Sequence, residues 1–162
     1  MLKSLQSRAR IHEARTAGQY DTVRMLFEAY ERALGFSLDF QRFDQELELL
    51  PGRYAAPGGC ILLAYRDDGE PTGCVALRPL EAGICEMKRL FVLPDAQGQG
   101  IGRDLAIAII ERARELGYKK MRLDTVASLI AANTLYATLG FHSIAAYCHN
   151  PLPGARFFEL EL

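Results

Sequence analysis

The chain has 162 residues, of which 49% are hydrophobic and 24% charged, so we expect one globular domain over residues 1–162. Its formal net charge is -1 and no run of Lys and Arg occurs, which argues against a nucleic-acid-binding surface. The longest apolar runs, 60–65 and 105–110, are too short to span a membrane, and residues 1–15 lack the apolar stretch of a secretory signal. We therefore expect a cytoplasmic protein that does not enter the membrane.

The cysteines and histidines do not have the spacing of metal ligands. No two of the four cysteines form a CxxC pair, and the three histidines form no HExxH pattern. We expect reduced thiols and no bound metal ion.

The first predicted elements are a short strand over 9–15 and a helix over 19–34. Apolar residues recur at helical spacing on one face of the helix, and Gly35 ends it. Asp39 is a plausible N-cap for a second helix, which would run to about residue 50.

Three strands are predicted in the middle of the chain. They cover 60–66, 72–80 and 84–93, and the connecting segments 67–70 and 80–83 have the composition of tight turns. Short connections of this kind predict an antiparallel meander.

The pattern changes after the meander. A helix is predicted over 100–116, a strand over 120–125, a helix over 128–139, and strands over 141–147 and 156–162. This order indicates an α+β or mixed α/β fold, in which helices flank a mixed sheet, and not a regular doubly wound sheet.

A glycine-rich turn joins the third strand of the meander to the helix that follows. Its sequence is Gln97-Gly98-Gln99-Gly100-Ile101-Gly102-Arg103. Glycines allow a ligand to approach the backbone closely, and the first N–H groups of a helix are unpaired at its positive end. The turn is therefore a candidate anion site, although it could also be a turn that only needs a flexible backbone.

Two common phosphate motifs do not fit this turn. The dinucleotide pattern GxGxxG would need a third glycine where the chain has Arg103 or Leu105. The Gly-Lys-Ser/Thr of a P-loop is also missing. The spacing alone leaves the identity of the anion open.

Two motifs together resemble the GNAT family of N-acetyltransferases. Gln97-x-x-Gly100-x-Gly102 resembles the family's Q/R-x-x-G-x-G/A signature, and the segment 135–141 resembles its LYxxxGF segment. The segment 88–94 also resembles the fourth strand of that fold, so the resemblance covers nearly the whole chain. It implies a mostly antiparallel, splayed mixed sheet flanked by helices.

The resemblance also implies a binding site for acetyl-CoA. Backbone amides of the turn would bind the pyrophosphate, and the pantetheine arm would lie between the splayed fourth and fifth strands. The cofactor-binding residues implied in this way are Leu90, Phe91, Val92, Gln97, Gly98, Gln99, Gly100, Ile101, Gly102, Arg103, Asn133 and Tyr136. Many family members carry an Asn seven residues before the tyrosine, whereas this chain has Leu129 there. Asn133 lies on the same predicted helix but out of register, so it could contact the cofactor or face solvent.

Glu86 and Tyr136 are the candidate catalytic residues. A glutamate on the fourth strand serves as general base in one branch of the family, and Glu86 matches it. Alternatively, Glu86 pairs with Lys88 or Arg78, or only positions substrate or a water. Tyr136 is protonated at neutral pH and could give a proton to the leaving thiolate, but it could also be a core aromatic.

The predicted reaction is direct transfer of acetyl from acetyl-CoA to a primary amine of a small molecule, peptide or protein in a ternary complex. Candidates for the acceptor pocket are Tyr30, Phe36, Arg78, Arg89 and Tyr147. The alternative is a non-catalytic acyl-CoA-binding or sensor module. Dimers are common among the proteins that this chain resembles, so a homodimer is a candidate assembly.

Overall fold

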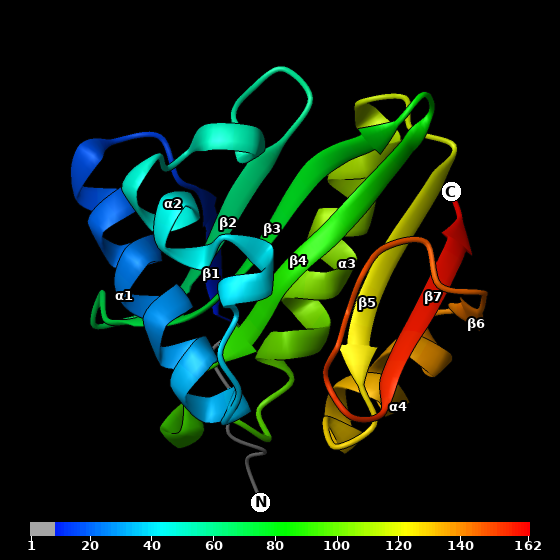
Figure 1. Cartoon of the computed structure of the whole chain (residues 1–162). Helices are drawn as coiled ribbons and strands as arrows, with labels where there is room; N and C mark the ends of the chain where they lie inside the picture. The colour runs from blue at the N-terminus through cyan, green and yellow to red at the C-terminus, as the bar shows by residue number, and fades with distance from the viewer. Residues whose placement is uncertain (1–8) are drawn as a thin grey trace, which may run out of the picture.

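The computed structural model describes residues 9–162, which build one seven-stranded sheet with the strand order β1-β2-β3-β4-β5-β7-β6 (Figure 1). The strands are β1 (Arg10–Glu13), β2 (Cys60–Tyr65), β3 (Pro71–Glu81), β4 (Ile84–Val92), β5 (Lys120–Val126), β6 (His142–Ser143) and β7 (Ala155–Glu161). Among these strands, β4 and β5 run parallel and the other paired strands are antiparallel. The predicted α+β fold with a mostly antiparallel mixed sheet is confirmed.

The helices cover both faces of the sheet. They are α1 (Ala17–Leu34), α2 (Phe43–Glu48), α3 (Ile101–Glu115) and α4 (Ile130–Thr138), with single 3₁₀ turns η1 (Asp39–Gln41), η2 (Gly52–Tyr54) and η3 (Pro94–Ala96). Figure 1 shows α1 and α2 on one face, and α3 and α4 on the other. Each face has its own buried cluster, because alternate residues of the central strands point to opposite sides.

Helix α1 follows the predicted helix closely. Thr16 caps its N-terminus and exchanges hydrogen bonds with Gln19 in a capping box, so the helix begins two residues before the predicted start. Gly35 adopts a left-handed conformation at φ 75° and ends the helix, as the sequence predicts.

Two predicted elements are wrong. Asp39 does not cap a continuous helix to residue 50, because the chain forms the turn η1 and then α2, separated by Arg42 in a left-handed conformation at φ 55°. This break lets both Leu38 and Phe43 reach the core. The strand expected over 141–147 is shortened to His142–Ser143, because after one more backbone hydrogen bond from Ile144 to Phe157 the chain leaves the sheet in a loop over 144–154.

Strands β4 and β5 separate along their length. They pair only where Ile84–Glu86 meets Lys120–Arg122, and no further pairing is recorded between them. On its other side β4 shifts register against β3 between Cys74 and Ala76, close to Arg89, which has φ 59°. The shift and the limited pairing open a V-shaped gap between β4 and β5, which is visible in Figure 1.

Candidate active site

A groove leads from the glycine-rich turn into the gap between β4 and β5. Its walls come from α1, the end of β4, the turn and the start of α4. Residues of the turn and of β4 that line it are Leu90, Phe91, Val92, Gln97, Gly98, Gly100, Ile101 and Gly102. Eight of the ten residues predicted over 90–92 and 97–103 thus line one groove together with Tyr30.

The backbone of the turn requires glycine at two positions. Gly98 and Gly100 have φ values of 78° and 83°, which side-chain-bearing residues rarely adopt. Gly100 is the N-cap of α3 and supplies no capping side chain, so the first N–H groups of this 15-residue helix remain available to a ligand. Gln97 Nε2 donates to the carbonyl oxygen of Val92 at 3.0 Å and ties the turn to the end of β4.

Two residues of the predicted turn lie outside the groove lining. The side chain of Arg103 contacts Thr138, with Nη1 3.4 Å from the hydroxyl oxygen, at an exposed position. Gln99 is exposed and has no recorded side-chain contact. The anion site is therefore built mainly from backbone.

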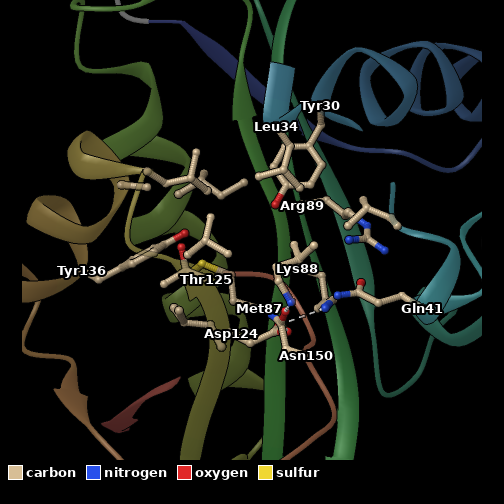
Figure 2. Close-up of a pocket in the computed structure, with 17 residues that line it drawn as sticks. Tyr30, Leu34, Gln41, Met87, Lys88, Arg89, Asp124, Thr125, Tyr136 and Asn150 are labelled. Atoms are coloured by element: carbon tan, nitrogen blue, oxygen red, sulfur yellow. Dashed lines mark hydrogen bonds and ion pairs between the residues drawn. The ribbon is translucent and has the colours of Figure 1, made fainter. Parts of the chain in front are cut away.

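The groove continues into a polar pocket between the splayed strands (Figure 2). Strand β4 contributes Lys88, Arg89 and Leu90, strand β5 contributes Asp124 and Thr125, helix α4 contributes Tyr136, and the 144–154 loop contributes Asn150. Tyr30, Leu34, Leu90, Leu129 and Ala132 line both the groove and the polar pocket. The two cavities are thus adjacent parts of one site.

Lys88 and Asp124 form an ion pair across the gap. Lys88 Nζ lies 3.1 Å from Asp124 Oδ1, and the two side chains are only 5% and 4% exposed. Asn150 Nδ2 donates to the other carboxylate oxygen at 3.0 Å. Burial and the neighbouring Arg89 lower the pKa of Lys88. Burial opposes ionisation of Asp124, but Lys88 and Asn150 outweigh it and hold the pKa of that carboxyl below its usual value.

Glu86 is buried beside this pocket with both oxygens engaged. Arg78 Nε donates to Oε1 at 2.7 Å, and the Tyr147 hydroxyl donates to Oε2 at 2.7 Å. Glu86 is not among the residues that line the polar pocket. Of the arrangements considered from the sequence, its contacts are those of an ion pair with Arg78.

Arg89 makes a second buried ion pair, with helix α2. Its guanidinium donates to both carboxylate oxygens of Glu46 at 2.9 and 3.1 Å and lies 5.9 Å from the Tyr30 ring centroid and 5.2 Å from that of Phe43. The Tyr54 hydroxyl also donates to Glu46 at 2.9 Å. Arg89 is therefore held at the edge of the pocket by a bidentate ion pair and two aromatic rings.

Tyr136 is buried at the end of the pocket that adjoins the groove. Its ring packs against Phe141 and Phe158, with centroids 5.7 and 6.4 Å apart. Burial, with smaller contributions from Tyr30 and Asp124, raises the pKa of Tyr136 above its usual range, so the hydroxyl stays protonated at neutral pH. The residue is thus a core aromatic that also faces the cavity.

Asn133 and Phe36 lie away from both cavities. Asn133 is half-buried, its Nδ2 donates to the Val126 carbonyl oxygen at 2.9 Å, and it is not among the groove residues. Leu129, at the position of the expected asparagine, does line the groove. Phe36 is 37% exposed and does not line the pocket.

The sequence prediction missed Glu46, Asp124 and Asn150. Glu46 and Asp124 lie in a predicted helix and a predicted strand, and Asn150 lies between two predicted strands. No local signal marks them, because their partners lie 43, 36 and 26 residues away.

One cluster in the described residues has the composition of a metal site. Ligand atoms of Glu86, Asp124 and Cys148 all lie within 4.8 Å of one another. The carboxylates already accept hydrogen bonds from other side chains, so the geometry does not favour an ion over these contacts. Over residues 9–162, none of the helices combines the length and apolarity that crossing a membrane requires.

A splayed mixed sheet, an unpaired helix N-terminus at a glycine turn and a pocket between the separated strands define the acyl-CoA N-acyltransferase fold. Residues 21–141, more than half of the chain, match the family model described as acetyltransferase (GNAT) family. The chain belongs to this family.

Three relatives show how far the similarity extends. An uncharacterised N-acetyltransferase of Schizosaccharomyces pombe is 39% identical over 143 residues, which is 88% of each chain. An IAA acetyltransferase of Azospirillum brasilense is 32% identical over 151 residues, covering 92% of this chain and 96% of the relative. The fold matches that of a Bacillus subtilis acetyltransferase in complex with CoA, with a TM-score of 0.70, 22% identity, and coverage of 96% and 99%. The protein is accordingly an acetyl-CoA-dependent N-acetyltransferase.

Proposed function

We propose that the protein transfers acetyl from acetyl-CoA to a primary amine held in the polar pocket, by direct attack in a ternary complex. The observation that carries this proposal is the continuity of the site. Leu90, Leu129 and Ala132 line both the groove that begins at the glycine turn and the pocket that contains Lys88 and Asp124. A cofactor in the groove would present its thioester to an amine in the pocket.

The groove is proposed to hold CoA chiefly by backbone groups. The pyrophosphate would accept hydrogen bonds from the N–H groups of the turn around Gly98, Gly100 and Gly102. The pantetheine amides would pair with β4 at Leu90–Val92, where β5 does not pair with it. Arg103 and Gln99 would then be at most peripheral to CoA, and Asn133 would hold the segment between β5 and α4.

Tyr136 is proposed as the general acid. The neutral amine attacks the thioester carbonyl carbon, so that the C–N bond forms and the C–S bond breaks. Tyr136 gives its proton to the leaving thiolate, and the phenolate regains a proton from the newly formed amide nitrogen. One further proton, lost by the ammonium before attack, passes to solvent. A backbone N–H near Leu90 would stabilise the oxyanion.

Glu86 is proposed to position the site and not to act as its base. Both of its oxygens are engaged by Arg78 and Tyr147, and the residue does not line the pocket. Through Tyr147 it would hold the 144–154 loop next to β4.

Two measurements test the function. Calorimetry should detect binding of acetyl-CoA, and an amine screen that follows free CoA thiol should detect turnover above hydrolysis. Binding without turnover for any amine would instead support the non-catalytic module. No binding would contradict the cofactor site itself.

The cytoplasmic location, the absence of a metal requirement and the homodimer remain predictions from the sequence.

A further inference from the structure

Three ion pairs lie around the polar pocket, and each has at least one buried member. They are Arg78–Glu86, Lys88–Asp124 and Arg89–Glu46. Each joins one cation to one carboxylate, so these six side chains have no net charge. A ligand that enters with an unbalanced charge would leave that charge buried, which is costly. The pocket therefore favours an acceptor that enters with no net charge.

Of these three pairs, Lys88–Asp124 is the one with both members in the pocket lining. Its atoms lie 3.1 Å apart and belong to the two strands that border the gap. An ammonium group has three donors, and the recorded bond of Lys88 uses one of them. Figure 2 shows the pair beside Asn150, with Tyr136 and Thr125 on the other side of the cavity. Arg89 also lines the pocket, but Glu46 balances its charge, so the cation and anion presented side by side are Lys88 and Asp124.

Two further polar atoms in the lining have no partner. Gln41 Oε1 and Thr125 Oγ1 are buried and make no hydrogen bond within the described residues. Thr125 as a whole is only 7% exposed. Buried polar atoms are normally satisfied, so these two indicate a polar ligand in this space.

The pocket is also partly covered. The 144–154 loop is held over it by Tyr147, which binds Glu86, and by Asn150, which binds Asp124. The ring of His149 meets the edge of Phe40 in η1 at a centroid distance of 6.4 Å, so the loop reaches the segment between α1 and α2. A space bounded on both sides fits a small molecule better than a folded protein surface.

We propose that the acceptor is a free α-amino acid, bound as a zwitterion at Lys88 and Asp124. Its carboxylate contacts the Lys88 ammonium, and its own ammonium lies beside the Asp124 carboxylate. The two charged groups of an α-amino acid are attached to the same carbon, so their spacing suits a pair of side chains in contact. The zwitterion enters with no net charge, and after its ammonium loses a proton to solvent the remaining carboxylate stays beside the Lys88 ammonium. This inference rests on the proposed function and specifies its substrate.

The test compares each proteinogenic amino acid with its α-carboxamide, using the unaltered protein, acetyl-CoA and detection of free CoA thiol. The amide keeps the amine but lacks the carboxylate that would bind Lys88. We expect kcat/KM to be about 30-fold or more lower for the amide of the best amino acid. Amides used as well as the acids would overturn the proposal, as would turnover confined to polyamines or lysine-containing peptides, although both results would support the transferase function. Binding of acetyl-CoA without turnover of any amine would contradict the transferase function and this inference with it.

A variant locates the effect at Lys88. Lys88→Gln should raise KM for the amino acid much more than KM for the amide, so that the preference for the acid is lost. Lys119→Gln, an exposed lysine outside the pocket, is the matched control and should keep the preference. Melting temperature and acetyl-CoA calorimetry check that both variants fold. If Lys88→Gln keeps the full preference, Lys88 does not bind the carboxylate. If it does not fold, the acid–amide comparison on the unaltered protein still decides.

Discussion

Strand β4 borders both parts of the site, and the two parts present different chemistry to it. In the groove, the contacts offered to a ligand come mostly from backbone, at Gly98, Gly100 and the start of α3. In the polar pocket, they come from charged side chains that belong to separate elements. A backbone site tolerates many side-chain changes, whereas each buried ion pair depends on both of its members. The comparison predicts that a single substitution should change either acetyl-CoA binding in the groove or the properties of the polar pocket, but not both.

The largest difference between the effect on kcat and the effect on acetyl-CoA binding is expected for Tyr136→Phe. The substitution removes the proposed acid but keeps the ring that packs on Phe141, so kcat should fall by about 10²–10⁴-fold. Binding of acetyl-CoA, measured by calorimetry, should change little because the turn is untouched. An unchanged kcat across the pH range would remove Tyr136 from the chemistry.

Glu46→Gln tests how far the pocket depends on paired charges. It leaves the guanidinium of Arg89 buried without its carboxylate, which should lower the free energy of unfolding by about 3–5 kcal/mol. Chemical denaturation measures the loss. Glu48→Gln, on the exposed side of the same helix, is the control and should have almost no effect. Equal losses for the two variants would show that the Arg89–Glu46 pair is not important for stability.

Gly100→Val tests the backbone site. The added side chain meets no neighbour but is strained at φ 83°, at a cost of about 1–2 kcal/mol. Relaxation of the turn should move its N–H groups and weaken acetyl-CoA binding about tenfold or more, which calorimetry would detect. Gly117→Val at the other end of α3 is the control, because Gly117 has φ 87° and also no neighbour within 4 Å. It should lower stability similarly and leave binding intact; a loss of binding in both variants would make the Gly100 effect structural.

The smallest effect concerns acid stability. Burial would raise the pKa values of Glu46 and Asp124, but Arg89 and Lys88 beside them lower these values below those of the unfolded chain. Their contribution to stability is therefore complete above about pH 5 and is lost as the pH falls through the unfolded and then the folded pKa values. Chemical denaturation between neutral pH and pH 3 should show this loss. Asp124→Asn should reduce the slope of the free energy of unfolding against pH. An identical slope would show that Asp124 does not contribute.

The difference between the backbone groove and the side-chain pocket also explains which parts of the molecule could be predicted from the sequence. The glycine turn and the LYxxxGF segment are local motifs, and helices such as α1 follow from the periodicity of apolar residues. The pairing of Lys88 with Asp124, or of Arg89 with Glu46, depends on the tertiary fold and leaves no local pattern. The break at Arg42 was also missed, because a left-handed residue other than glycine has no clear sequence signal.

The exposed cysteine at the edge of the pocket has a practical use. Cys148 is exposed, with Sγ 3.9 Å from Asp124 Oδ2, whereas Cys60, Cys74 and Cys85 are buried. Burial and then the Asp124 carboxylate raise the pKa of Cys148 to about 11, so alkylation should be slow at neutral pH and faster as the pH rises. The sequence contains no tryptophan. A fluorophore attached at this thiol would therefore report acceptor binding by an optical signal with little intrinsic background, before any acetyl group is transferred.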